Sequence, residues 1–145
     1  MLFRSVRLTL DEWMTNLFRP DRPETDVIAW YVERAERCVD QIWRVTQGVL
    51  AAGVDVVLEI GLIVRSDRER LYARVDAAAL ELDIHVVDAP RDVRRERVLQ
   101  RNQQRGETFS MEVPLPFFEL ASDRWEPLDE SECEGRRVRF TGSAQ

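Results

Sequence analysis

Residues 54–63 read Val54-Asp55-Val56-Val57-Leu58-Glu59-Ile60-Gly61-Leu62-Ile63, a nearly continuous apolar run that has the acid Glu59 inside it. This pattern predicts a strand that is buried on both faces, as strands are in a parallel sheet. The later run Ile84-His85-Val86-Val87 predicts a second buried strand, with His85 as a core or rim residue. Two shorter β-prone stretches, 6–9 and 138–140, predict strands near the ends of the chain.

Helical spacing occupies the segments between these strands. Apolar residues recur at three- and four-residue steps from about residue 25 to residue 52, and Gly53 is placed to end that helix. Ser66-Asp67-Arg68-Glu69 has the pattern of a capping box and predicts a helix to about residue 82. Further helices are expected at 92–104 and 117–125. The alternation of strands and helices predicts an α/β fold with a parallel sheet and right-handed crossovers, in one domain of residues 1–145.

The composition restricts the class of protein. Hydrophobic residues make up 44% and charged residues 33% of the chain, which is typical of a globular protein. A net charge of −6 argues against nucleic-acid and anionic-membrane partners. The first residues contain no signal peptide, so we expect a cytoplasmic protein. Cys38 and Cys133 lack metal-ligand spacing and the chain has one His, so no metal site built from these residues is predicted.

Two acids follow predicted strands, at the carboxyl ends where parallel sheets bind ligands. Glu59 can contact a magnesium ion or its water, or it can form a buried ion pair with a nearby arginine such as Arg65; the spacing supports both interpretations equally. Asp11 can act as a general base towards a substrate hydroxyl, or it can cap a short helix. Trp13 is expected in the core or in a pocket wall.

An arginine stripe marks the predicted helix 92–104 and the residue after it. Arg94, Arg97, Arg101 and Arg105 recur at three- and four-residue steps. Arginine side chains bind phosphate oxygens through two parallel hydrogen bonds, so the stripe can clamp a nucleotide. The alternative is a solvated charged helix face, supported by acids such as Glu96.

One motif is absent from the sequence. A phosphate-binding P-loop has the pattern G-x-x-x-x-G-K-[ST] between a strand and a helix, because its amides and lysine surround the phosphates. The six glycines never have this spacing, and all 21 basic residues are arginine, so the chain contains no lysine. The usual loop is therefore missing, and not only degenerate.

The chain resembles the small bacterial P-loop kinase-like ATP-binding proteins, which are described as AAA family ATPases and are related to zeta toxin and chloramphenicol phosphotransferase. The resemblance runs from Val6 onward and rests on five segments in this order: Val6-Arg7-Leu8-Thr9-Leu10-Asp11-Glu12-Trp13, Asp55-Val56-Val57-Leu58-Glu59-Ile60-Gly61, Arg65-Ser66-Asp67-Arg68-Glu69-Arg70, Val87-Asp88-Ala89-Pro90-Arg91 and Arg97-Val98-Leu99-Gln100-Arg101-Asn102.

The resemblance implies a P-loop NTPase-like three-layer sandwich and ATP-dependent transfer of a phosphoryl group to a small-molecule hydroxyl, with Mg²⁺. Asp11 would be the substrate-side base and Glu59 the magnesium-side carboxylate. The lid-like segment, about residues 91–113, would supply Arg97, Arg101 and Arg105 to the nucleotide. Arg65 and Trp13 would contact the substrate.

The departure from this group is the loss of its first strand, P-loop and first helix. That strand lies in the middle of the sheet, so its loss leaves backbone groups of the neighbouring strand without partners. We therefore expect a truncated or mis-started form of a longer protein, inactive or incomplete as given. The alternative function is a non-catalytic anion-binding or interaction module, with a possible homodimer formed through the incomplete sheet.

Overall fold

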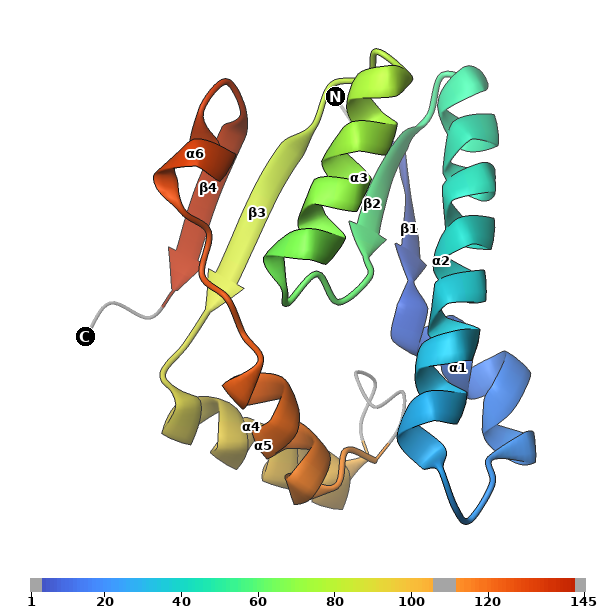
Figure 1. The fold of residues 1–145 in the computed structure, drawn as a ribbon, viewed down its shortest axis with the longest axis vertical. Helices are drawn as coiled ribbons and strands as arrows, with labels where there is room; N and C mark the ends of the chain where they lie inside the picture. The colour runs from blue at the N-terminus through green and yellow to red at the C-terminus, as the bar shows by residue number, and fades with distance from the viewer. Residues whose placement is uncertain (1–3, 106–111, 143–145) are drawn as a thin grey trace. The chain divides into compact units, whose positions relative to one another are not determined.

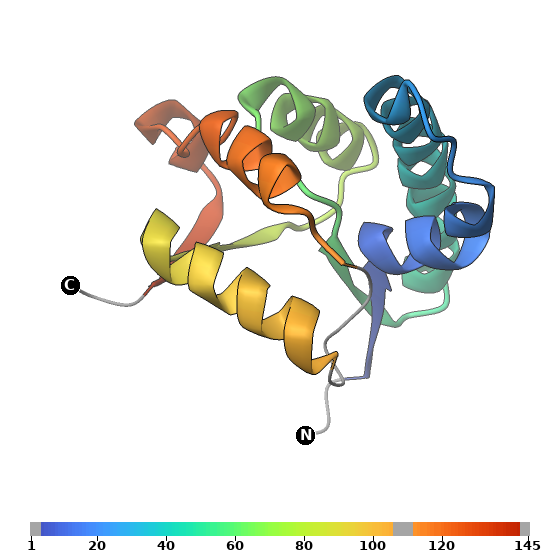
Figure 2. The same ribbon diagram turned by 90° about the horizontal axis from the view of Figure 1, so that it is seen from below.

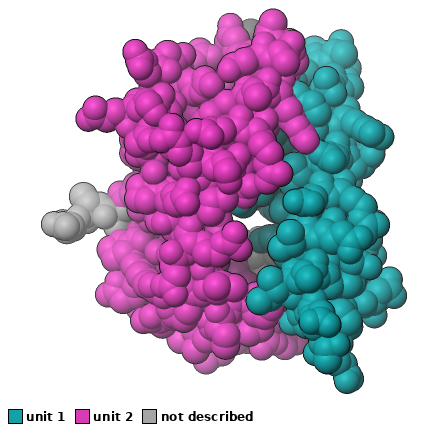
Figure 3. Space-filling model, in the orientation of Figure 1, with its two compact units in different colours: residues 1–61 teal, residues 62–145 magenta. Residues whose placement is uncertain are grey.

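The computed structural model describes residues 4–105 and 112–142 (Figure 1). The chain divides into two compact units, residues 1–61 and 62–145 (Figure 3). Each unit contains one pair of parallel strands together with its own helices. The predicted α/β class and the parallel pairing of the strands are therefore confirmed, whereas the single domain stays a prediction.

The first unit is built around one long helix. Its elements are β1 (Ser5–Thr9), α1 (Leu10–Phe18), the 3₁₀ turn η1 (Arg19–Asp21), α2 (Val27–Ala51) and β2 (Asp55–Glu59). β1 and β2 pair in parallel, with Val6 opposite Val56 and Thr9 opposite Glu59. Helix α2 packs against α1 and β2 (Figure 1). The core of the unit consists of Leu8, Leu10, Met14, Cys38, Ile42 and Ile60.

In its described residues the second unit contains the other strand pair and four helices. Its elements are α3 (Arg65–Ala77), β3 (Asp83–Asp88), α4 (Arg91–Gln104), α5 (Leu115–Asp123), α6 (Glu130–Cys133) and β4 (Arg137–Gly142). β3 and β4 pair in parallel, with Val86 opposite Phe140. Helices α4 and α5 run side by side, as Figures 1 and 2 both show. Among the described residues, no helix combines the length and the hydropathy needed to span a bilayer.

The helix starting at residue 65 is not capped as the sequence predicted. Val64 is the N-cap residue and makes no side-chain cap hydrogen bond, so the expected capping box of Ser66 and Glu69 is wrong. The amide of Arg65 instead donates to Oε2 of Glu126 at 2.6 Å. A carboxylate 61 residues away thus satisfies an amide of the first turn, which no local pattern can predict.

The strands are more exposed than their apolar sequences predicted. Along β2 the side chains alternate between exposed and half-buried, and Val57 is 47% exposed. Along β3 only Val86 is buried, and Val87 is 79% exposed. The expectation of strands buried on both faces is therefore wrong. The physical reason is that, among the described residues, packing covers mainly one face of β2, whereas the face that carries Asp55, Val57 and Glu59 is exposed.

Candidate functional site

The carboxyl end of the β1–β2 pair holds the two candidate acids of the first unit. Thr9 and Glu59 lie opposite each other in the parallel register, and Asp11 follows Thr9 by two residues, so both acids lie at the same end of the sheet. Oε1 of Glu59 is 3.6 Å from Nε of Arg7, and the side chain of Glu59 is 51% exposed. The interpretation of Glu59 as a buried partner of Arg65 is therefore wrong, because Glu59 is neither buried nor paired with that residue.

Asp11 lies inside the first turn of α1 and is not its cap. The N-cap residue is Thr9, which makes no side-chain cap hydrogen bond, and the helix begins at Leu10. A carboxylate at this position interacts favourably with the positive end of the helix dipole. Burial, together with the nearby charge of Asp11, raises the pKa of Tyr31 to about 12. Asp11 therefore lies close to a half-buried phenol, and Trp13 is half-buried on the same helix as Asp11.

Two arginines of α4, Arg91 and Arg95, are bound to α5. Nε of Arg91 lies 2.9 Å from Oε2 of Glu119, and Nε of Arg95 lies 2.6 Å from Oε1 of the same carboxylate. Arg91 also bonds to Asp123 at 2.7 Å. Arg94 donates to a backbone carbonyl, that of Ala89, at 2.9 Å. Arg91 and Arg95 therefore join the two helices, and Arg94, the first residue of the stripe, is engaged by the backbone just before α4.

The three arginines predicted to bind nucleotide have different environments. Arg97 is exposed and has no ion-pair partner among residues 4–105 and 112–142. Nε of Arg101 is buried and finds no hydrogen-bond partner within the same described ranges. Arg105 lies just beyond α4, with φ of 46°, and its Nη2 is 3.6 Å from Oε2 of Glu112. Arg97 and Arg101 are therefore the better candidates for binding an anion.

The lid-like segment, about residues 91–113, is described only in part, because residues 106–111 lie outside the described ranges. At its described ends, the side-chain amide of Asn102 donates to the carbonyl of Val113 at 2.8 Å. Oδ1 of Asn102 also accepts from the amide of Val113 at 3.1 Å. One side chain thus fixes the end of α4 to the segment that leads into α5.

Arg65 is engaged with carboxylates of its own unit. Its Nε lies 2.7 Å from Oε1 of Glu69, its Nη2 bonds to Oγ of Ser131 at 3.0 Å, and its Nη1 pairs with Asp129. The hydrogen bond that this guanidinium donates to Glu69 raises its pKa above the ordinary value, and the charge of Asp129 adds to the effect. Arg65, which was predicted to contact the substrate, thus forms part of the contact between α3 and α6.

Sequence reasoning missed the buried ion pair of the second unit. Nε and Nη2 of Arg68 lie 2.7 and 3.0 Å from the two carboxylate oxygens of Glu132, and both side chains are at most 3% exposed. The hydroxyl of Tyr72 donates to the same carboxylate at 3.3 Å. The bonds from Arg68 hold the pKa of Glu132 below its usual range. This pair is a structural contact and is not open to a ligand.

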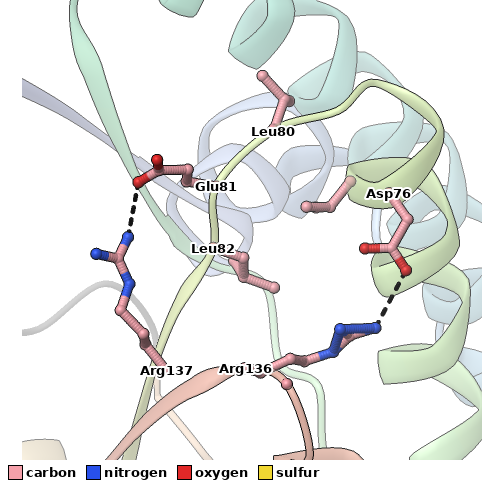
Figure 4. Close-up of a pocket in the computed structure, with 8 residues that line it drawn as sticks. Asp76, Leu80, Glu81, Leu82, Arg136 and Arg137 are labelled. Atoms are coloured by element: carbon pink, nitrogen blue, oxygen red, sulfur yellow. Dashed lines mark hydrogen bonds and ion pairs between the residues drawn. The ribbon is translucent and has the colours of Figure 1, made fainter.

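A pocket of about 330 Å³ lies at the amino ends of β3 and β4 (Figure 4). Arg136 lies 4.3 Å above the ring of Tyr72 and bonds to Asp76 at 3.2 Å. Arg137 bonds to Glu81 at 2.9 Å. Because each of these guanidinium groups already has a carboxylate partner, and because ligands of parallel sheets bind at the opposite end, this pocket is not the candidate site.

The described residues do not fit Mg²⁺–ATP by themselves. Within residues 4–105 and 112–142, no group of three or more His, Cys, Asp or Glu side chains can hold a metal ion. In the segment between β2 and α3, Gly61 has the positive φ, 68°, that a phosphate-binding turn uses, and the sequence offers no lysine beside it. The structure provides acids in the first unit and arginines in the second, without a set of amides for a triphosphate.

The contact between α4 and α5 predicts a pH dependence. Hydrogen bonds from Arg95 and Arg91 lower the pKa of Glu119 to about 2 from an ordinary value of 4.5. A carboxyl with a depressed pKa stabilises the fold above its unfolded pKa, and this contribution is lost as the pH falls through the folded value. We expect urea unfolding to show a loss of stability from about pH 5 to pH 2 that is smaller in Glu119→Gln. Equal slopes for the two proteins would contradict this, and Glu96→Gln, on the exposed face of α4, is the control.

Comparison with known families gives one match. The profile of a family described as "AAA domain" matches residues 3–128, which is most of the chain and includes both units. A search of curated proteins finds no match.

Proposed function

This chain belongs to the AAA domain family, a nucleotide-binding lineage of ATPases and kinase-like proteins, and we propose that it derives from an ATP-dependent phosphotransferase of the cytoplasm that acts on a small-molecule hydroxyl. In this proposal Asp11 is the substrate-side base and Glu59 is the magnesium-side carboxylate. Arg97 and Arg101 bind phosphate oxygens, with a smaller part for Arg105.

The observation that carries the proposal is the register of β1 and β2. It places Glu59 and the start of α1 at the same carboxyl end of a parallel pair, where α/β proteins bind their ligands. Glu59 is exposed, so its carboxylate can reach a hydrated cation without being desolvated first. In this proposal Trp13, which is half-buried two residues after Asp11, lines the substrate side.

The proposal also includes a limit on activity. A triphosphate needs several amides and a lysine to balance its charge, and the sequence supplies neither in the required pattern. The arginines of α4 can contribute charge, but Arg91 and Arg95 are already bound to Glu119. We therefore propose that the chain by itself binds Mg²⁺–ATP weakly and transfers no phosphoryl group.

Thermal unfolding with nucleotide tests this function. If the dissociation constant is about 1 mM, 1 mM Mg²⁺–ATP stabilises the chain by about 0.4 kcal/mol and raises Tm by about 1–2 °C. The shift should disappear in the double variant Arg97→Gln/Arg101→Gln. It should persist in Arg124→Gln/Arg139→Gln, which removes the same charge from exposed positions of the same unit.

Two outcomes would contradict the proposal. A shift of more than about 6 °C at 1 mM ATP would mean affinity far above what arginines alone provide. No shift at about 10 mM ATP would remove nucleotide binding from the function of this chain, and would favour the non-catalytic interaction module as the alternative. Under that alternative, the edges of the sheets, which are two-stranded among the described residues, would accept other strands.

A further inference from the structure

The sheet of the first unit is small, yet one of its strands has the apolar sequence of an interior strand. It consists of two parallel strands within the described residues, whereas parallel strands usually belong to larger sheets that are covered on both faces. β1 carries Arg7 at its centre, as edge strands often carry a charge, but the centre of β2 is Val56-Val57-Leu58. The composition of β2 is therefore that of an interior strand, although only β1 pairs with it in the described part of the chain.

The open side of β2 has a defined chemistry. Asp55, Val57 and Glu59 alternate along one face, all of them exposed, and Val57 is 47% exposed. Val56 and Leu58 form the other face and are half-buried. Arg7 lies 3.6 Å from Glu59 and offsets part of its charge, but Asp55 has no ion-pair partner among the described residues. A strand that pairs with this edge therefore has Asp55, Val57 and Glu59 beside its own side chains on the exposed face.

A second copy of this chain fits the edge poorly. In a two-fold antiparallel pairing centred on Val57, Asp55 of one copy lies opposite Glu59 of the other, and this occurs twice. Directly opposed like charges destabilise a strand pair. Shifting the register to separate these acids shortens the pairing of a strand that has only five residues. The charges therefore argue for a different partner.

We propose that the free edge of β2 is an interaction surface for an extended segment of another polypeptide, with apolar residues in its middle and a basic residue at each end. The main-chain groups of β2 supply the hydrogen bonds of an added strand. An apolar side chain of the partner covers Val57, and its basic ends lie beside Asp55 and Glu59. This inference shares Glu59 with the proposed nucleotide site, but it needs none of the arginines proposed to bind phosphate, so peptide binding can be tested without nucleotide.

The probe is the peptide acetyl-Arg-Val-Ile-Val-Arg-amide, which places Arg, Ile and Arg on one face and reads the same in both directions. We expect it to bind the full chain in a fluorescence or calorimetric titration and to slow hydrogen exchange at residues 55–59. The same peptide with every backbone amide methylated keeps its side chains but cannot donate hydrogen bonds to β2. It should bind at least about tenfold more weakly.

Charge reversal provides the second arm of the test. Asp55→Arg, at an exposed position, should weaken the binding of the basic peptide by about tenfold. It should strengthen the binding of acetyl-Glu-Val-Ile-Val-Glu-amide. Glu36→Arg makes the same charge change on the exposed side of α2 and should leave both affinities unaltered. Circular dichroism of each variant confirms that the fold is retained before the affinities are compared.

Three results would overturn the inference. The basic peptide fails to bind the folded chain, or it binds equally well with its amides methylated, which would mean apolar adsorption without strand pairing. Protection from exchange falls outside residues 55–59. The free chain sediments as a dimer and already protects those amides, in which case the occupant of the edge is a second copy.

Discussion

Glu132→Ala is expected to destabilise the protein by about 3–5 kcal/mol, the usual cost of leaving one member of a buried ion pair without its partner. Arg68 is 3% exposed and donates to the two carboxylate oxygens of Glu132 at 2.7 and 3.0 Å, and to the carbonyl of Leu62 at 3.2 Å. Removing the carboxylate leaves a guanidinium that water cannot reach. Glu132 also accepts from the amide of Asp129 at 3.3 Å in the capping box of α6, so the variant loses a helix cap as well.

Urea unfolding of three variants measures this effect. Glu130→Ala lies two residues away at an exposed position and should change stability by less than about 0.5 kcal/mol. The double variant Arg68→Met/Glu132→Leu removes both charges and should be much less destabilised than Glu132→Ala, because no charge remains buried. A loss of only about 1 kcal/mol in Glu132→Ala would show that Arg68 is hydrated and that the pair is not a buried contact.

The signal for this ion pair was present in the sequence but was not used. Arg68 precedes Leu71, Tyr72 and Val75 at the spacing of one helix face, and those three residues form the buried stripe of α3. An arginine on such a stripe predicts an acid beside it in the core. The identity of that acid was not predictable, because Glu132 lies 64 residues further along the chain in a four-residue helix that has no apolar periodicity of its own.

Elements whose signals are local were predicted well, and properties that depend on distant neighbours were not. The helix expected from about residue 25 to residue 52 is found as α2, and the late strand expected at 138–140 is found within β4. The burial of β2 was predicted wrongly because an apolar sequence indicates that a strand prefers a buried environment. It does not show which neighbouring element, if any, covers the strand. The same reason explains why one of the two interpretations of Glu59 paired it with a nearby arginine such as Arg65, whereas its carboxylate lies beside Arg7 of the adjacent strand.

The candidate arginines of α4 show the same contrast between what local spacing predicts and what distant contacts decide. Helical spacing placed Arg94, Arg97 and Arg101 on one face correctly, since all three lie on α4. Spacing could not show that Arg94 is bound to the carbonyl of Ala89, or that Glu119 of α5 holds Arg91 and Arg95. The structure therefore narrows the candidate anion ligands to the residues of α4 that α5 does not engage.

Ile42→Ala is expected to cost the first unit about 2–5 kcal/mol, because it removes a fully buried side chain and leaves a cavity. Ile42 is 1% exposed, and Cys38 and Thr46, one turn away on either side, are each 3% exposed. Ile28→Ala makes the same chemical change on the same helix at a side chain that is 51% exposed, and should cost less than about 1 kcal/mol. Hydrogen exchange of the amides of α2 and β2 measures both variants. Because α2 packs on β2, Ile42→Ala should also increase hydrogen exchange in β2, the strand that carries Glu59 and the proposed interaction edge. Similar exchange rates in β2 for Ile42→Ala and Ile28→Ala would show that this helix does not hold β2 in place.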